Sequence, residues 1–372
     1  MQWLGAAAGL VLIGVVLVDA FEVMLLPRRV RHGYRLVRLA YRLMWGVWRW
    51  VGLRLSGGAF RHALFSVFGP LSLFGLILLW ALGLIAGFAL LHWSLESAVA
   101  GTEGNFFVYL YFSGTTFFTL GYGDLVPVGP LGRTLSFVEA GMGYIFLAVI
   151  ISYLPVLYQA FSRREITISL LDARAGSPPT AGELLRRLAQ SRQTACPFLI
   201  EWERWSADLL ESHVSFPVLS FYRSQHDNQS WVAALTIILD TSALLIAAVD
   251  GDGYQARLTF AMARHAAVDI GLAFQISPCP QIQDRLSEAD FARLREILVT
   301  AGLPMRDVAA SIKGLTKLRE LYEPFVRALA AHFQFALPPF QPEKPPVDNW
   351  QTSPWTKRSP GLGGLAGGEE VH

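Results

Sequence analysis

The sequence predicts an all-α integral membrane protein with a large water-soluble part. Of its 372 residues, 53% are hydrophobic and only 16% are charged, whereas soluble domains carry about 25% charged residues. Three segments before residue 165 reach the length of about 20 apolar residues that a membrane span needs. This composition excludes a disordered protein and argues against a wholly cytosolic one. The net charge of +2 indicates no nucleic-acid partner, and two cysteines cannot build a disulfide framework.

The first element expected is a transmembrane helix over residues 1–26. This segment is uncharged until Asp19, and it lacks the basic start and the cleavage site of a signal peptide. Asp19 and Glu22 lie three residues apart, on one face near the inner end of the span. They form either a functional intramembrane site or ion pairs with arginines, and we favour the pairs.

The second element, residues 27–62, is basic. Nine arginines and no acidic residue lie between Arg28 and Arg61, so the positive-inside rule places this segment in the cytoplasm and the N-terminus outside. Six arginines share one helical face, and leucines and tryptophans occupy the others, which predicts a helix lying in the membrane interface. A voltage sensor is the alternative, but only one span precedes these arginines. The six arginines are Arg28, Arg31, Arg35, Arg38, Arg42 and Arg49.

The second and third spans are expected at residues 63–91 and at about 131–161. The second carries no charge, and the third is uncharged from Ala140 onward. The third span contains Gly143 and Pro155, which are candidates for a gating hinge. The alternative is that its glycines only permit close helix packing, and the sequence leaves both interpretations open.

The stretch between these two spans, residues 106–124, is too short to cross the membrane and return as two full spans. We therefore expect a re-entrant half-helix followed by a tight extended segment. Such irregular backbone is tolerated at membrane depth only where protein or a water-filled path surrounds it.

The end of this stretch, Thr119-Leu-Gly-Tyr-Gly-Asp124, resembles the selectivity filter of potassium channels, whose commonest form is T-V-G-Y-G-D. Upstream, Tyr111-Phe-Ser113 and Thr116 match the pore-helix pattern, and downstream Val126-Pro127, Gly132-Arg133 and Glu139 match the start of the inner helix. The resemblance covers about residues 63–161. It implies a potassium-channel pore domain of outer helix, pore helix with filter, and inner helix, here with an extra N-terminal span and a helical cytoplasmic domain.

The resemblance also implies the role of each filter residue. Rings of backbone carbonyls replace the hydration shell of K⁺, and glycines adopt the backbone angles that aim successive carbonyls the same way. The filter residues implied are Thr119, Leu120, Gly121, Tyr122, Gly123 and Asp124, with support from Tyr111, Phe112, Thr116 and Phe118. Leu120 replaces the usual valine, and Phe118 stands where many relatives have threonine or serine. We expect these two departures to change packing and inactivation rather than selectivity.

One filter per chain implies a homotetramer, since a fourfold pore needs four such loops. The function expected is a potassium-selective channel rather than an enzyme, with K⁺ ions in the filter and no other cofactor. Its partners are K⁺, the lipid bilayer, three further copies and an unknown cytoplasmic regulator. The alternatives are a non-selective cation channel, and a membrane-anchored ligand sensor or enzyme with the pore as its output. The arginine-rich composition favours a prokaryotic plasma membrane.

Residues 162–337 are expected to form a helical cytoplasmic domain, after an extended stretch at 165–172. The segment 231–249 is either a fourth span or the buried core helix of this domain, and we favour the core helix. No glycine-rich phosphate loop in a βαβ unit is visible. The other helices are expected at about 182–193, 198–213, 254–274, 288–301 and 314–335. Residues 338–372 are rich in proline and glycine and predict a disordered tail.

Polar side chains cluster in this domain without a recognisable metal spacing. They form either a ligand or metal site or a set of satisfied buried groups and helix caps, which are commoner. The residues are Glu211, His213, His226, Asp227, Asp240, His265 and Asp269.

Overall fold

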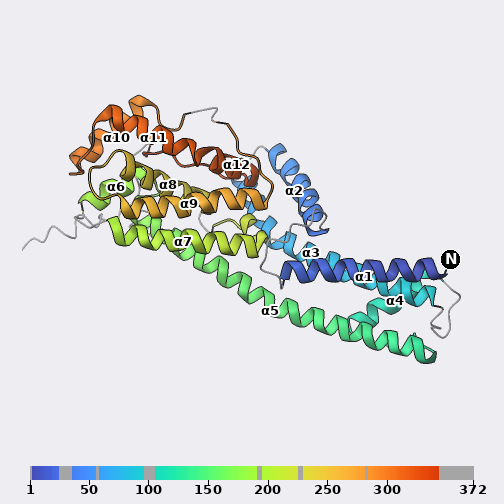
Figure 1. Ribbon diagram of the computed structural model, residues 1–372. Coiled ribbons are helices and arrows are strands. Elements are labelled where there is room, and N and C mark those ends of the chain that lie inside the picture. Colours follow the sequence, from blue (N-terminus) through green and yellow to red (C-terminus); the bar gives the residue numbers. More distant parts are fainter. Residues whose placement is uncertain are drawn as a thin grey trace, which may run out of the picture. The chain divides into compact units, whose positions relative to one another are not determined.

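The computed structural model describes residues 2–24, 36–55, 58–95, 105–190, 195–224, 229–280 and 284–342. Within these ranges the fold is all-α, as predicted, and the only strand-like pairing is an isolated bridge between Val249 and Met305 (Figure 1). The chain divides into two compact units. The first comprises Met1–Ala160 with Ser215–Tyr222, and the second comprises Phe161–Val214 with Arg223–His372.

Three helices of the described chain are long and apolar enough to cross a membrane: Trp3–Met24, Phe60–Ser94 and Gly129–Ala175. They coincide with the three spans that the sequence predicts. The third belongs to α5 (Gly129–Ala175), whose 47 residues span about 70 Å at 1.5 Å per residue. That length is more than twice the thickness of the hydrocarbon layer, so α5 continues well beyond the membrane.

In the first unit, α1 (Gln2–Met24) packs against α3 (Gly58–Ser94). Glycines permit the close approach: a Cβ at Gly87 would lie 2.6 Å from Ile13, and one at Gly9 would lie 2.7 Å from the carbonyl of Gly87. Small residues at a helix contact are the usual means of tight packing in membranes. Near the other end of this seam, Asp19 accepts a 2.8 Å bond from the indole of Trp80.

The basic segment forms α2 (Leu36–Arg54), which packs on α3 through its aromatic face. The short helix η1 (Pro217–Phe221) joins this packing from far along the sequence. Phe221 stacks on Tyr41 at 5.5 Å and lies 5.1 Å from both Trp45 and Phe68, measured between ring centroids. The first unit therefore has an aromatic cluster that is completed by a later part of the chain.

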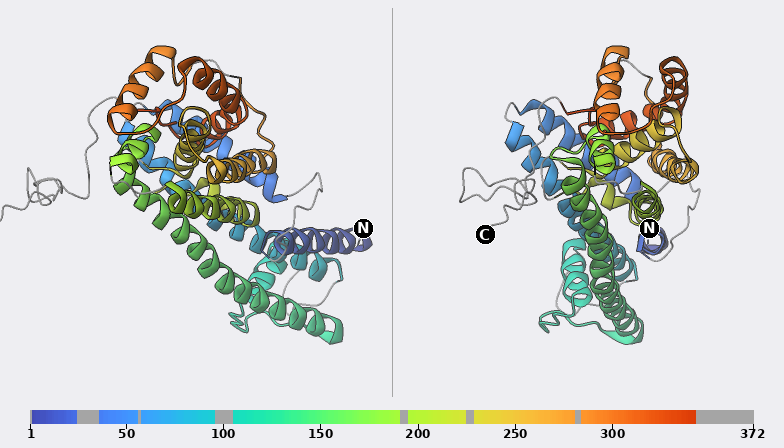
Figure 2. Two further views of the ribbon diagram at one scale, coloured as in Figure 1. Left: turned by 60° about the vertical axis from the view of Figure 1, so that its left-hand side comes forward. Right: turned by 90° about the vertical axis from the view of Figure 1, so that its left-hand side faces the viewer.

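The second unit is built around α8 (Trp231–Ala247), which lies among α6 (Ala181–Gln190), α9 (Tyr254–Ala273), α11 (Val308–Glu320) and α12 (Glu323–Phe333) (Figures 1 and 2). The remaining helices are α7 (Ala195–Ser215) and α10 (Glu288–Thr300). Nearly every side chain of α8 is buried, and Ser230 caps its N-terminus by accepting a bond from the Ala233 amide. Protein surrounds α8, so of the two predicted alternatives it is the core helix.

Two local predictions are wrong. Residues 165–172 are helical rather than extended, because α5 runs through them without a break (Figure 2). Ile168 and Leu171 are buried three residues apart on one helical face, and this burial outweighs the strand preference of the β-branched residues. The single helix expected at 314–335 is two helices that meet at Leu321 and Tyr322. Pro324 lies in the first turn of the second one, a position that proline favours.

Candidate functional site

The centre of the first unit is a short helix, α4 (Phe106–Phe117), followed by a sharp reversal of the chain. Asn105 caps its N-terminus by accepting a 3.1 Å bond from the Phe107 amide. At the other end, the amide of Thr119 donates to the Thr116 carbonyl at 3.0 Å, and that of Leu120 donates to the Thr115 carbonyl at 2.8 Å. These bonds end α4 and fix the start of residues 119–124, the predicted filter segment. The predicted half-helix and the tight segment after it are both present.

The backbone of residues 119–123 alternates between left-handed and other φ angles. Thr119, Gly121 and Gly123 have φ angles of 55°, 54° and 80°, while Leu120 and Tyr122 between them do not lie in this left-handed region. Glycine adopts such angles without strain, whereas a β-branched residue such as Thr119 rarely does. In an ordinary extended strand, neighbouring carbonyl groups point to opposite sides. Where every second residue has a left-handed φ angle, the carbonyl groups point to the same side. The backbone therefore has the form that a row of oxygen ligands requires.

Three of the residues expected to support the filter lie on α4, and the fourth, Phe118, is its C-cap. Tyr111 donates a 3.0 Å hydrogen bond from its hydroxyl to Asp124, which ties the end of the filter back to α4. Phe112 is buried and packs edge-on against His92 at 5.1 Å. Thr116 is half-buried, and Phe118 is 56% exposed, with its ring 5.4 Å from that of Phe117.

A buried polar chain lies behind the predicted filter segment, and the resemblance that includes Ser113 and Glu139 does not predict the contacts that form it. Ser113 of α4 is hydrogen-bonded to Glu139 of α5, and the other carboxylate oxygen of Glu139 lies 3.2 Å from Nε2 of His92 on α3. Ser113 also contacts the carbonyl of Ile85 at 2.8 Å. All three side chains are fully buried. The available signal was an acid and a histidine within or beside apolar spans, where ionisable groups are rare.

The two hinge candidates lie within the uninterrupted helix α5. A Cβ at Gly143 would overlap the carbonyl oxygen of Phe117, so this glycine permits close packing between α5 and α4. This contact supports the packing interpretation, and a hinge at Gly143 or Pro155 stays a prediction.

The residues proposed for a ligand or metal site have separate partners. His213 is buried beside Arg164, and its Nδ1 lies 2.9 Å from the Leu209 carbonyl. His265 pairs with Asp269 at 3.6 Å on α9, and Glu211 is exposed on α7. His226 and Asp227 lie outside the described residues. Within the described ranges no three potential metal ligands converge, so the site remains a prediction without geometric support.

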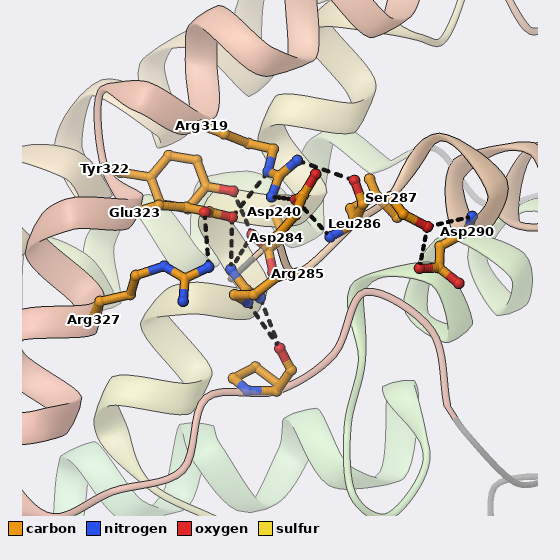
Figure 3. A network of polar contacts seen from close by, with 11 residues as sticks. Asp240, Asp284, Arg285, Leu286, Ser287, Asp290, Arg319, Tyr322, Glu323 and Arg327 are labelled. Atoms are coloured by element: carbon orange, nitrogen blue, oxygen red, sulfur yellow. Dashed lines mark hydrogen bonds and ion pairs between the residues drawn. The ribbon is translucent and has the colours of Figure 1, made fainter. Parts of the chain in front are cut away.

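Asp240 belongs to a buried ionic network in the second unit (Figure 3). It binds Arg285 at 2.5 Å and accepts a hydrogen bond from the hydroxyl of Tyr322. Arg285 also reaches Glu323 at 3.3 Å and donates to the carbonyl of Pro338 at 2.7 Å. Burial alone would lower the pKa of Arg285, but the adjoining Asp240 carboxylate raises it above its ordinary value.

The start of the predicted tail takes part in this network. Phe340 is 1% exposed, and the guanidinium groups of Arg285 and Arg319 lie 5.0 and 5.4 Å from its ring centroid. The packed chain therefore extends to residue 342, and residues 343–372 lie outside the described ranges.

The candidate site lies within the part of this chain that matches a known protein family. Residues 75–159, which include α4, the filter and the first two-thirds of α5, match the family model described as "Ion channel". No solved structure matches the chain.

Three curated bacterial proteins are similar to parts of the chain. The uncharacterized membrane protein YdjJ of Bacillus subtilis is 27% identical over 51% of this chain and 57% of its own length. Protein LctB of Geobacillus stearothermophilus is 51% identical over 12% of this chain and 31% of its own length. The inward rectifier potassium channel Kirbac3.1 of Paramagnetospirillum magnetotacticum is 43% identical over 16% and 19%. The chain thus spans less than two thirds of each of these relatives.

Proposed function

We propose that four copies of this chain form a potassium-selective ion channel in a prokaryotic plasma membrane. The observation that carries the proposal is the alternating backbone of residues 119–123 at the end of a short helix between two apolar spans. This arrangement offers a row of carbonyl oxygens, which is the ligand set that replaces the hydration shell of K⁺. It lies inside the residues that match the ion-channel family model.

Similarity to a named potassium channel supports K⁺ as the ion. Kirbac3.1, described by its name as an inward rectifier potassium channel, is 43% identical over 60 residues. In this chain both filter glycines and Tyr122 are present, and Leu120 and Phe118 are the departures from the commonest pattern. Both side chains are more than half exposed in the single chain.

The exposure of the filter in a single chain supports assembly. Tyr122 is 69% exposed, and Phe137 and Tyr144 on α5 are 80% and 71% exposed. Apolar side chains of a span can face lipid, but the irregular backbone of a filter cannot, since lipid leaves its polar groups unsatisfied. Three further copies around a common axis would cover it and enclose a water-filled path.

The arginines of α2 support the proposed orientation, with this helix and the second unit on the cytoplasmic side. Arg42 and Arg49 are exposed on α2, and so are Leu43, Val47 and Trp50 beside them. Such a surface suits the boundary between lipid headgroups and acyl chains. The second unit would then be placed to modulate the pore from the cytoplasm.

Two measurements on the purified full-length protein test this function. Calorimetric titration with K⁺ and with Na⁺ measures ion binding without requiring an open gate. Reversal potentials in planar bilayers, with K⁺ on one side and Na⁺ on the other, measure selectivity. We expect K⁺ to bind more tightly than Na⁺ and the reversal potential to lie near that for K⁺. Both properties should be lost in Gly121→Ala, because alanine is strained at a φ of 54°.

Gly14→Ala is the matched control, since an added methyl at position 14 meets no atom within 4 Å. Equal binding and permeation of Na⁺ and K⁺ would favour the non-selective channel. A tetramer that binds neither ion would contradict a filter, and would favour the ligand sensor or enzyme. A protein that stays monomeric in a bilayer would contradict the shared pore.

A further inference from the structure

Helices α4 and α5 touch at two points that are in register. Ser113 bonds to Glu139, and Phe117 meets Gly143 through its carbonyl. Four residues, about one helical turn, separate the two contacts on each helix. The filter begins at Thr119, only two residues after the second contact. A change in either contact would therefore shift the start of the filter along or around the axis of α4.

The first contact also includes α3. Ser113 touches both Glu139 and the Ile85 carbonyl, but its hydroxyl has a single proton to donate. If Glu139 is ionised, it accepts this proton's hydrogen bond, and Ser113 donates nothing to Ile85. If Glu139 is protonated, it donates to Ser113, which then donates to Ile85. In both arrangements Ser113 links α4 to a neighbouring helix without leaving its place.

His92 holds the far side of the carboxyl group. Its Nε2 lies 3.2 Å from Oε2 of Glu139, and both side chains are fully buried. A proton on Nε2 satisfies this contact in either arrangement of Ser113. Because a carboxyl group buried without partners would be costly, His92 makes it possible for Glu139 to reach Ser113 at this depth. Residues from α3, α4 and α5 thus meet at one buried point behind the filter.

We propose that Glu139 is a positioning residue for ion selectivity. Supported by its contact with His92, Glu139 bonds to Ser113 and so fixes the position of α4 along its axis, and this position gives the filter its K⁺ preference. This inference rests on the proposed function. It assigns the preference partly to hydrogen bonds outside the filter rather than to the filter residues alone. The effect depends on the geometry of the hydrogen bonds and not on the charge of Glu139, so a neutral group of the same shape can replace the acid.

The test uses the full-length tetramer and three variants. Ser113→Ala removes the hydroxyl, Glu139→Leu removes both contacts of the acid, and Glu139→Gln keeps a donor toward Ser113 and an acceptor toward His92. The first two should lower the ratio of K⁺ to Na⁺ affinity about five- to tenfold, the effect of losing one net hydrogen bond. Glu139→Gln should retain most of the wild-type ratio. Bi-ionic reversal potentials should follow the same order.

Ser136→Ala is the matched control, because the Ser136 hydroxyl bonds only within α5, to the Gly132 carbonyl at 2.9 Å. Thermal unfolding is measured in parallel. Variants that unfold earlier but keep the wild-type ion ratio would show a purely structural role and overturn the inference. A Glu139→Gln variant as impaired as Glu139→Leu would overturn the bonding mechanism. A wild-type protein without K⁺ preference would instead refute the proposed function, and the inference with it.

Discussion

Gly143 of α5 lies directly against the main-chain carbonyl of Phe117, the last residue of α4. Main-chain atoms at the end of a capped helix cannot turn aside as a flexible side chain can. Position 143 is therefore closed to any larger residue as long as α4 keeps its place.

The first prediction is that Gly143→Ala displaces the end of α4 and abolishes the K⁺-selective conduction that we propose for this chain. The added methyl has to push apart two packed helices, which costs about 1–3 kcal/mol. Gly14→Ala, where the methyl meets open space, should behave as wild type. Native mass spectrometry and calorimetric K⁺ titration measure assembly and binding. If Gly143 serves only as a hinge, the variant keeps its K⁺ affinity and changes only its open probability.

The second prediction concerns acid sensitivity in the second unit. Burial, together with the nearby Arg164 charge, lowers the pKa of His213 well below its usual value. Arg164 donates to Nε2 while Nδ1 faces the Leu209 carbonyl, so the ring is held neutral. For a base with a lowered folded pKa, the stabilisation is complete above the unfolded pKa of about 6.5 and is lost as the pH falls below it.

The free energy of unfolding should therefore fall by up to about 1.4 kcal/mol per pH unit below pH 6.5 on account of His213. His213→Gln keeps an acceptor for Arg164 and should flatten this slope. Denaturant unfolding at several pH values, followed by tryptophan fluorescence, measures it. His265→Gln is the control, because the His265 side chain is 60% exposed. An unchanged slope in His213→Gln would contradict the neutral buried ring.

The third prediction is that Arg285→Met destabilises the second unit by about 3–5 kcal/mol, because it leaves the Asp240 carboxylate buried without its cation. The double variant Asp240→Leu with Arg285→Met should recover much of the loss, since it removes both charges. Arg293→Met is the control at a pair whose arginine is 68% exposed. Chemical denaturation measures these variants and the single variant Asp240→Leu, and additive effects of the two single substitutions would argue against direct coupling.

The fourth prediction concerns the attachment of α1. Asp19 accepts from the Trp80 indole at 2.8 Å and from the Val37 amide at 3.3 Å. Asp19→Asn retains only one acceptor oxygen. Its side-chain NH₂ group would face the N–H of Trp80 or of Val37, which is also a donor. We expect a loss of about 1–3 kcal/mol, seen as a lower unfolding temperature in detergent. An unfolding temperature unaffected by the substitution would speak against this bond.

The backbone form of residues 119–123 could be predicted from the sequence because its signal is local. Gly121 and Gly123 occupy alternate positions, and the structure gives both the left-handed angles that glycine accepts. The spans could be predicted for the same reason, since each is a continuous stretch of about 20 mainly apolar residues. Pro324 is also a local signal for the start of a second helix, although the pattern on both sides of it is helical.

The buried polar chain behind the filter could not be predicted in this way. His92 and Glu139 are 47 residues apart, and only the folding of α3, α4 and α5 brings them to one point. The same applies to Asp240 and Arg285, which are 45 residues apart. No spacing rule relates such pairs, so a list of polar residues mixes members of different contacts. This is why His213 and Asp240, proposed for one site, have unrelated partners.

The place of residues 215–222 in the first unit has a consequence for how this protein can be divided. The chain passes between the two units three times, after residues 160, 214 and 222. A truncation after α5 would remove Phe221, and the rings of Tyr41, Trp45 and Phe68 would lose a common neighbour. The two units are therefore not two consecutive stretches of the sequence. A chimaera joined at a single junction would contain a first unit without residues 215–222. Only an exchange that retains these residues would keep the first unit complete.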